Sequence, residues 1–570
     1  MSPQHDTAAA TATFCATLVD EWLRCGIRTA MVAPGSRSTP LALALAARNE
    51  MRVEMFHDER SAAFAALGSA LATGMPAVVL CTSGTAAAHF HAAVVEAHLS
   101  DVPMIVCTAD RPPELRDVGA PQTIDQTKIY GDAVRWFHDP GVPSFDAFNT
   151  WRSLAARTVA IATGQRPGPV HLNLPFREPL VGTAVELPAA RSSSSADAAW
   201  TRSLHGDRID DEELSPLVAV LSQTNGVIVA GRGAQHEVLS LARALGWPVL
   251  ADPLSGLREC DPHVVVAFDG IVRAERSSAL VPAVVVRVGS PPASKVLAQW
   301  IARHRPTVVQ VSPTAAVVDP DHSVAHHIVG DVAVVCLSLA ARVQSTDASW
   351  NAAWMRAETA AQTTLTSWVD AHWSEIAVAR TVTDSLPDGS HLVVSSSMPI
   401  RDVEWFGAVT PGAQVHANRG ANGIDGVVST AVGVAVGSGR HTTVLIGDVA
   451  VLHDSNGLLG LAARDVSMTV VITNNDGGSI FSFLPQADVV ASSTFEQLYG
   501  TPHGVDFAAL AAAHGLTYRK VSSAAELRDV VSRGGTQLVE AAFDRSLNVA
   551  LHQQCQQLVA AAVDGALAAL

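Results

Sequence analysis

Two polar side chains follow neighbouring apolar, strand-like segments in the last third of the chain. Asp448 follows the run Thr442–Ile446, and Asn475 follows the run Met468–Thr473. The segment between them, His453–Arg464, is predicted to be a helix, and a strand–helix–strand unit forms a right-handed parallel crossover. Both side chains would then lie at the sheet edge where open α/β folds bind ligands. A carboxylate and an amide oxygen there suit Mg²⁺, whose other positions go to water and phosphates.

A second candidate is an acid at a strand-to-helix junction in the first third of the chain. The strand-like run Arg52–Phe56 is followed by Asp58, Glu59 and Arg60, and then by an alanine-rich helix. Alone, Glu59 is explained as a first-turn glutamate that the helix dipole favours. A carboxyl group in a dehydrated pocket could instead exchange protons with a ligand.

Four arginines follow strand-like segments. They are Arg37 in PGSRS, Arg111 in TADRPPEL, Arg401 in SMPIR and Arg419 in NRG. A single arginine is usually a solvated surface residue. Four at strand ends indicate a ligand rich in carboxylates, because the guanidinium fork binds carboxylates bidentately.

The elements that must position these residues alternate between helix and strand along the whole chain. This alternation is typical of an α/β fold with doubly wound parallel sheets. We predict three such domains, at residues 1–185, 205–345 and 355–570, with a serine-rich linker at 186–204. Three units also suit the chain's length of 570 residues.

A glycine-rich turn in the middle domain has two interpretations. The strand Gly226–Ala230 leads through Gly231 and Gly233 into the helix Glu237–Leu245. The dinucleotide pattern GxGxxG fails at its last position, where His236 stands, and no acidic residue clearly occupies the ribose-binding place. We therefore favour a structural Rossmann-like domain and keep nucleotide binding as the alternative.

Composition limits the classes of partner. The net charge of −16 argues against nucleic acid or an anionic membrane as the main partner. The seven cysteines are odd in number and form no CxxC pair, which is typical of a reducing compartment. No apolar run reaches membrane-spanning length and no signal peptide is evident, so we expect a cytoplasmic protein without membrane insertion.

The residues of the first paragraph resemble a known motif. GDV at 447–449 and NN at 474–475 are similar to the GD(G)…NN motif of the thiamine-diphosphate enzymes, with a valine where many members have a second glycine. The resemblance implies that Asp448, Asn475 and the carbonyl group of Gly477 hold Mg²⁺, with Mn²⁺ as the alternative metal, and through it thiamine diphosphate. It also implies pyrimidine-binding, middle and diphosphate-binding domains, in that order.

Within this family one glutamate serves the aminopyrimidine ring of the cofactor. By resemblance it is Glu59, which would hydrogen-bond to a ring nitrogen and start the proton relay. Family members form the site between two subunits, so a homodimer or homotetramer is implied. Ile424, in the turn GIDG, would be the bulky residue that bends the cofactor.

Four longer segments give a more specific resemblance. PGSRSTPL, TADRPPEL, NRGANGIDG and GGSIFSFLP are similar to the 2-succinyl-5-enolpyruvyl-6-hydroxy-3-cyclohexene-1-carboxylate synthases of menaquinone biosynthesis. Such an enzyme decarboxylates 2-oxoglutarate and adds the succinyl-semialdehyde carbanion to isochorismate in a 1,4 sense. The resemblance assigns cofactor binding to Glu59, Ser397, Ile424, Gly447, Asp448 and Asn475, the succinyl end to Ser397, Arg401 and Arg419, isochorismate to Ser36, Arg37, Arg111, Gln122 and Lys295, and an apolar wall to Ile480, Phe481 and Leu484.

One departure and two alternatives remain. Val296 follows Lys295 where the family often has a second basic residue, so the middle domain keeps only part of the family's pattern for binding isochorismate. Another carboligase of the acetolactate-synthase type is the closest rival, although such enzymes handle smaller monocarboxylates. A non-catalytic scaffold that kept the fold is the other alternative, and the intact Glu59 and Asp448 argue against it.

Overall fold

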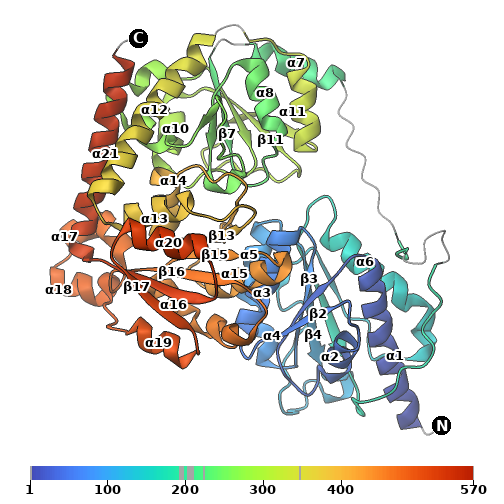
Figure 1. The fold of residues 1–570 in the computed structure, drawn as a ribbon. Coiled ribbons are helices and arrows are strands. Elements are labelled where there is room, and N and C mark those ends of the chain that lie inside the picture. The colour runs from blue at the N-terminus through green and yellow to red at the C-terminus, as the bar shows by residue number, and fades with distance from the viewer. Residues whose placement is uncertain (1–2, 192–197, 202–210, 223–224, 346–347, 569–570) are drawn as a thin grey trace. The chain divides into compact units, whose positions relative to one another are not determined.

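The structure is a computed structural model. Within the residues it describes, three parallel six-stranded sheets follow one another along the chain (Figure 1), which confirms the predicted α/β fold. Part of the predicted linker 186–204 lies outside these residues. The structure describes the chain except for residues 1–2, 192–197, 202–210, 223–224, 346–347 and 569–570.

The first sheet consists of short strands, three of which are buried along their whole length. Its strands are β1 (Thr29–Val32), β2 (Arg52–Met55), β3 (Ala77–Cys81), β4 (Met104–Asp110), β5 (Trp136–His138) and β6 (Pro169–Pro175), and the helices of this part are α1 (Pro3–Arg24), α2 (Thr39–Ala46), α3 (Glu59–Thr73), α4 (Thr85–His89), α5 (His91–Leu99) and α6 (Trp151–Ala162). The strand order is β2-β1-β3-β4-β6-β5. Every residue of β3, β4 and β6 is buried, as expected for strands covered on both faces.

The middle sheet is of the Rossmann type. Its strands are β7 (Gly226–Ala230), β8 (Val249–Ala251), β9 (Val264–Val265), β10 (Val284–Val288), β11 (Thr307–Ser312) and β12 (Val324–Val329), and its helices are α7 (Asp211–Leu221), α8 (Glu237–Leu245), α9 (Phe268–Arg273), α10 (Lys295–His304) and α11 (Val332–Ala340). The order β9-β8-β7-β10-β11-β12 is the 3-2-1-4-5-6 order of dinucleotide-binding folds. A Cβ atom on Gly231 would lie 1.7 Å from the carbonyl oxygen of Ser290. Close backbone packing therefore accounts for this glycine without a nucleotide.

The third sheet repeats the strand order of the first. Its strands are β13 (His391–Val394), β14 (Gln414–His416), β15 (Thr442–Gly447), β16 (Met468–Asn474), β17 (Thr517–Val521) and β18 (Gln537–Ala542), and the helices of the last part of the chain are α12 (Ala348–Ala371), α13 (Glu375–Asp384), α14 (Met398–Phe406), α15 (Val427–Ser438), α16 (Asp448–His453), α17 (Gln486–Val489), α18 (Ser492–Phe495), α19 (Phe507–Ala513), α20 (Ala524–Arg533) and α21 (Arg545–Leu567). The order β14-β13-β15-β16-β18-β17 corresponds strand by strand to that of the first sheet.

The predicted helix His453–Arg464 is wrong. The crossover from β15 begins with the short helix α16, which starts at Asp448 itself, and continues as two 3₁₀ turns at 455–458 and 461–463. Gly460 has a φ of 73°, a left-handed conformation that interrupts a helix. The run Asp454-Ser455-Asn456 also offers side chains that compete for backbone hydrogen bonds.

Two helices of the last part complete the core of the middle sheet. Trp354 of α12 and Cys555 of α21 are buried in one apolar cluster with Phe268 and with Val285 of β10. Figure 1 shows α21 running beside α12. The predicted domain limits at 345 and 355 therefore do not separate two independent cores.

Backbone contacts divide the chain into two compact units. The first contains residues 1–205 together with 418–440 and 452–466, and the second contains the remaining residues. In the first unit α3 packs on α15. A Cβ atom on Gly68 would lie 1.9 Å from the carbonyl oxygen of Thr430, so the two helices approach closely.

Candidate active site

The predicted metal ligands lie at the carboxyl edge of the third sheet. β15 and β16 are neighbouring parallel strands, with Gly447 opposite Thr473. Asp448 comes directly after Gly447 and Asn475 comes two positions after Thr473, and both are buried. The edge lies where the strand order reverses between β13 and β15, which is where open α/β sheets bind ligands.

The carboxylate of Asp448 is held by backbone amides. Its Oδ2 accepts hydrogen bonds from the N–H groups of Asn475 at 3.1 Å and Gly477 at 3.0 Å, and its Oδ1 accepts one from Val449 at 2.7 Å. Gly477 has a φ of 139°, and a Cβ atom there would lie 1.9 Å from the carbonyl oxygen of Gly500. Only glycine fits this loop, and the loop brings all three predicted ligands together.

The orientation of Asn475 fits a divalent cation. Its Nδ2 donates a hydrogen bond of 3.0 Å to Oε1 of Glu375. Its Oδ1 is buried and, among the described residues, has no hydrogen-bond partner. An unpaired buried oxygen is costly, and beside a carboxylate it forms part of a hard oxygen donor set of the kind that Mg²⁺ prefers. The residues therefore fit the metal that the motif implies.

A buried charge network supports this end of the site, and the sequence did not indicate it. Burial, and then the charge of Asp402, raise the pKa of Glu375 to about 7. His552 Nε2 lies 2.8 Å from Asp402 Oδ1, and although burial opposes the imidazolium, the charges of Asp402 and Glu375 raise its pKa. Glu375 follows Ser374, the N-cap of α13. In sequence it is therefore an ordinary first-turn glutamate.

A histidine from a distant loop also faces the metal end. His503 Nε2 lies 3.3 Å from Oδ2 of Asp448, and its Nδ1 accepts a hydrogen bond from the N–H of Val505. Asp476 fixes this loop by accepting from the N–H groups of His503 and Gly504. No motif in the sequence predicted this histidine.

Ser397 and Arg401 lie after β13, beside the metal loop in strand order. Ser397 has a φ of 79° and precedes the first residue of α14, one turn before Arg401. The guanidinium of Arg401 donates to the carbonyl oxygen of Ser397. Two of the three residues predicted to hold the succinyl end therefore contact each other at the start of one helix.

The predicted apolar wall follows the metal loop directly. Ile480 and Phe481 lie in the 3₁₀ turn Ser479–Phe483, and the ring of Phe481 lies 5.5 Å from that of Tyr499. Ile480 and Phe481 are half-buried and Leu484 is 40% exposed. The three residues form a partly open apolar surface that a ligand could cover.

Glu59 is the first residue of α3, at the carboxyl edge of the first sheet. Burial, and then the charge of Glu59, raise the pKa of the Cys81 thiol at the end of β3. Asp58 caps the helix by accepting from the N–H of Arg60, and its other oxygen accepts from Asn456 Nδ2 at 2.9 Å. The residues beside Glu59 are thus fixed to a segment that follows α16.

The loop 418–426 carries Arg419 and Ile424 and belongs to the same compact unit as Glu59. Asn418 Nδ2 donates to Oγ1 of Thr430 at the start of the loop. Arg419 and Ile424 are both half-buried. The structure therefore places the predicted cofactor-bending residue just before α15, the helix that packs on α3.

Four of the five residues predicted to bind isochorismate, all except Lys295, gather around the turn that follows β3. The N–H of Arg37 donates to Thr82 Oγ1, Gln122 Nε2 donates to the carbonyl oxygen of Ser83, and Arg111 donates to that of Pro121. Ser36, Arg111 and Gln122 are exposed or half-buried.

Arg37 is the most constrained of this set. Its residue is 3% exposed, and its guanidinium donates to the carbonyl oxygen of Phe176 and pairs with Glu178. A ligand could contact only the small part of Arg37 that these partners leave exposed. Its role in substrate binding stays a prediction.

Family descriptions match all three parts of the chain. "Thiamine pyrophosphate enzyme, N-terminal TPP binding domain" matches residues 13–129, "Middle domain of thiamine pyrophosphate" matches 195–394, and "Thiamine pyrophosphate enzyme, C-terminal TPP binding domain" matches 405–540. Thiamine pyrophosphate is another name for thiamine diphosphate. The N- and C-terminal matches cover Glu59 and Asp448, respectively.

Similar proteins extend over almost the whole chain. A 2-succinyl-5-enolpyruvyl-6-hydroxy-3-cyclohexene-1-carboxylate synthase of Chloroflexus aurantiacus is 42% identical over 558 residues, covering 94% of each chain. Synthases of the same name from Geobacillus kaustophilus and Rubrobacter xylanophilus are also 42% identical, covering 96% and 94% of this chain and 97% and 96% of theirs. The chain belongs to this synthase family. It is a thiamine-diphosphate-dependent enzyme.

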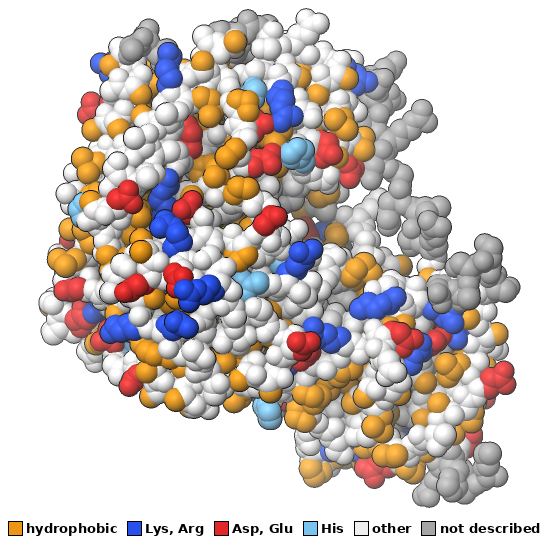
Figure 2. Space-filling view, in the orientation of Figure 1, with side chains coloured by type: hydrophobic (Ala, Val, Ile, Leu, Met, Phe, Trp, Pro, Cys, Tyr) orange, Lys and Arg blue, Asp and Glu red, His pale blue; other side chains and the backbone are white. Residues whose placement is uncertain are grey.

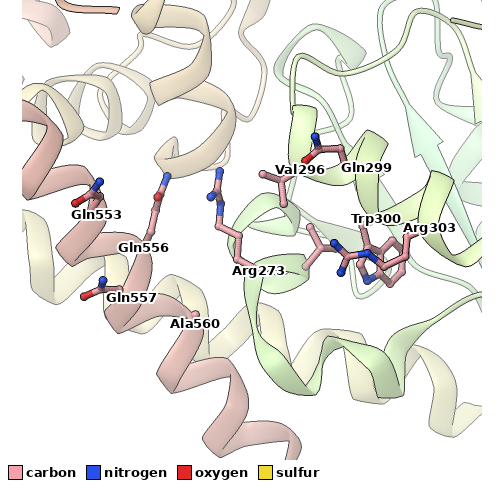
Figure 3. A pocket seen from close by; sticks show the side chains of 10 residues that line it. Arg273, Val296, Gln299, Trp300, Arg303, Gln553, Gln556, Gln557 and Ala560 are labelled. Carbon is pink, nitrogen blue, oxygen red and sulfur yellow. The ribbon is translucent and has the colours of Figure 1, made fainter. Parts of the chain in front are cut away.

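Lys295 lies apart in the sequence from the other predicted residues of this synthase site. It is exposed at the first position of α10. Val296 beside it lines a cavity with Trp300, Arg273 and Gln556, in which glutamines of α21 face residues of α10 (Figure 3). The valine that departs from the synthase pattern thus contributes an apolar side chain to this cavity.

Basic and acidic side chains are interspersed on the face drawn in Figure 2. All seven cysteines lie within the described residues and are free thiols. Among the helices that the structure describes, none is both long and apolar enough to cross a membrane.

Removing the carboxylate of Glu375 is expected to weaken Mg²⁺ binding by this synthase. In Glu375→Ala the amide of Asn475 loses the acceptor that fixes its orientation, and loss of such a supporting group typically costs about 10- to 100-fold in metal affinity. Titration of the metal-free protein with Mg²⁺ in the presence of thiamine diphosphate measures the effect. Glu358→Ala is the control, because Glu358 is a buried glutamate that accepts from the N–H of Ala267 in the middle core. Equal Mg²⁺ affinity in both variants would contradict the prediction.

Proposed function

We propose that this chain decarboxylates 2-oxoglutarate on thiamine diphosphate and adds the remaining succinyl-semialdehyde unit to isochorismate by 1,4-addition. The product is 2-succinyl-5-enolpyruvyl-6-hydroxy-3-cyclohexene-1-carboxylate, an intermediate of menaquinone biosynthesis. The observation that carries this proposal is the buried loop in which the N–H groups of Asn475 and Gly477 hold the carboxylate of Asp448, in a chain that is 42% identical to synthases of that name.

Mg²⁺, or Mn²⁺ in its place, would be held by the carboxylate of Asp448, the unpaired Asn475 Oδ1 and the carbonyl oxygen of Gly477. When bound, thiamine diphosphate supplies the carbon that attacks the 2-oxo group and takes up the electrons released with CO₂. Glu59 would hold a proton at the aminopyrimidine nitrogen, and Ile424 would support the bent cofactor.

The arginines divide the two substrates between them. Arg401 and Arg419, with Ser397, would bind the distal carboxylate of 2-oxoglutarate. Ser36, Arg37, Arg111, Gln122 and Lys295 would bind isochorismate. Water must be excluded after CO₂ leaves, because a proton from water would end the reaction before the second substrate adds. Ile480, Phe481 and Leu484 would provide this apolar cover.

We place the reaction in the cytoplasm and the active sites between the subunits of a homodimer or homotetramer. The unpaired cysteines support a reducing compartment. If Glu59 and Asp448 of one site come from different subunits, mixing two inactive variants restores activity. Unfolded and refolded together, Glu59→Gln and Asp448→Ala chains should regain about a quarter of the wild-type activity, because random pairing leaves that share of sites intact. No recovery would show that each chain supplies both residues of its own site.

The direct test is identification of the product. The protein is incubated with 2-oxoglutarate, isochorismate, thiamine diphosphate and Mg²⁺, and the product is identified by mass. We expect the succinyl adduct, and little product when pyruvate replaces 2-oxoglutarate. Equal use of pyruvate would favour a carboligase of the acetolactate-synthase type.

A further inference from the structure

We propose that Glu96 is a positioning residue that sets the preference for a donor with a distal carboxylate. It acts by holding the loop 418–426, from which Arg419 reaches the substrate. This inference rests on the proposed function and deepens it, because no motif and no comparison assigns a role to Glu96.

The carboxylate of Glu96 binds the backbone of this loop with both oxygens. Oε1 accepts from the N–H of Gly420 at 2.7 Å and Oε2 accepts from the N–H of Ala421 at 2.7 Å. Ser100 Oγ donates to Oε1 at 2.7 Å, and Glu96 is only 3% exposed. Hydrogen bonds to an ionised carboxylate are the strong ones, so two consecutive peptide groups are fixed directly after Arg419.

The loop is also seated tightly on the helix that carries Glu96. A Cβ atom on Gly420 would lie 2.7 Å from Ser100 Oγ and 2.8 Å from the carbonyl oxygen of Glu96. This glycine permits the approach, and any larger residue would lift the loop from α5. The peptide group that follows Arg419 is therefore held in a single position.

The stability of α5 does not explain a glutamate at this place. Glu96 lies in the last turn of α5, which ends at Leu99. A negative charge near a helix C-terminus is unfavourable, because the macrodipole is negative there. Burial adds a desolvation cost. The contacts with the loop are what compensate for both.

The guanidinium of Arg419 is left for another partner. Among the described residues it has neither a hydrogen bond nor an ion pair, and the residue is half-buried. The far end of the loop is fixed as well, because a Cβ atom on Gly426 would overlap the ring of Phe64 at 2.0 Å. A loop held at Gly420, Ala421 and Gly426, with an unpaired arginine directly before the first of these residues, is suited to placing one positive charge at a set point.

The test compares two donors that differ only at the far end. 2-Oxoglutarate carries a carboxylate where 2-oxopentanoate carries a methyl group. The ratio of their kcat/KM values measures recognition of that carboxylate. In Glu96→Gln, one N–H of the loop faces the NH₂ group of the new side chain and loses its acceptor. We therefore expect the ratio of kcat/KM values to fall at least about tenfold. This factor is the lower end of what a hydrogen bond to a charged group contributes. Arg419→Ala should lower the ratio at least as far.

Two further variants separate positioning from stability. Ser100→Ala removes one hydrogen bond of the carboxylate and keeps both loop contacts, so the ratio should stay at the wild-type value. Glu96→Asp keeps the charge but is too short to reach both N–H groups, and it takes the place of Glu96→Gln if that variant does not fold. A purely structural Glu96 would lower the melting temperature and leave the ratio unchanged.

The outcomes distinguish this inference from the proposed function. Suppose that the ratio falls below its wild-type value in Arg419→Ala but keeps that value in both Glu96 variants. This result overturns only the positioning role of Glu96 and leaves the proposed function intact. If the wild-type protein shows no preference for 2-oxoglutarate over 2-oxopentanoate, the proposed function fails, and the inference fails with it.

Discussion

Replacing Glu59 with glutamine is expected to slow proton exchange at the reactive carbon of bound thiamine diphosphate by several orders of magnitude. The carboxamide keeps the size of the side chain but cannot supply the proton that the aminopyrimidine nitrogen needs. A positioned acid or base contributes about 10²- to 10⁴-fold, so both exchange and turnover should fall within that range. Hydrogen–deuterium exchange at this carbon, followed by NMR after rapid acid quench, measures the step without either substrate.

The matched control exchanges a carboxylate for a carboxamide elsewhere near the first sheet. Glu50 is an exposed residue whose side chain pairs with Arg48. Glu50→Gln should exchange protons at the wild-type rate. Cofactor affinity of Glu59→Gln should stay within a few-fold of wild type. Near-normal exchange in Glu59→Gln would show that this residue is not the proton relay.

Replacing Asp448 should remove the stabilisation that the cofactor gives to the folded protein. A ligand at 100 times its Kd stabilises the native state by about 2.7 kcal/mol, so thiamine diphosphate with Mg²⁺ should raise the melting temperature of the wild-type protein by several degrees. Asp448→Ala lacks a metal ligand and should show little shift. Differential scanning fluorimetry with and without both ligands measures this.

Asp448→Ala also leaves three backbone N–H groups without their acceptor, which lowers the stability of the ligand-free protein. Asp448→Asn keeps an acceptor and separates this effect from metal binding. Asp529→Ala is the control, because Asp529 pairs with Arg533 on the exposed face of α20. Full activity of Asp448→Ala without added metal would contradict the ligand assignment. A wild-type protein that no cofactor concentration stabilises would indicate a scaffold.

The ends of several strands, including those that carry site residues, could be predicted from the sequence. β7 and α8 begin and end at the predicted residues, because a short apolar run bounded by glycine leaves few alternatives. Asp448 and Asn475 meet because sequential strands joined by a crossover are usually neighbours. Local pattern and topology together were sufficient there.

The supporting residues could not be predicted, because their partners are distant in sequence. Glu375 lies 100 positions from Asn475, and Glu96 lies 324 positions from Gly420. No local period or motif marks Glu375, which accepts from a side-chain amide, or Glu96, which accepts from backbone amides of another predicted domain. The failed helix after Asp448 has a different cause, since three polar residues and two glycines outweighed an apolar pattern that suited a helix.

The repeated strand order of the first and third sheets has a consequence for the origin of the chain. β2 leads into α3 and β14 leads into α15, so the two helices that pack together hold the same place in each repeat. Contact between equivalent elements is what a twofold axis produces between identical subunits. Gene duplication and fusion of a self-pairing ancestor would leave this pattern, after which one half specialised in the acid and the other in the metal.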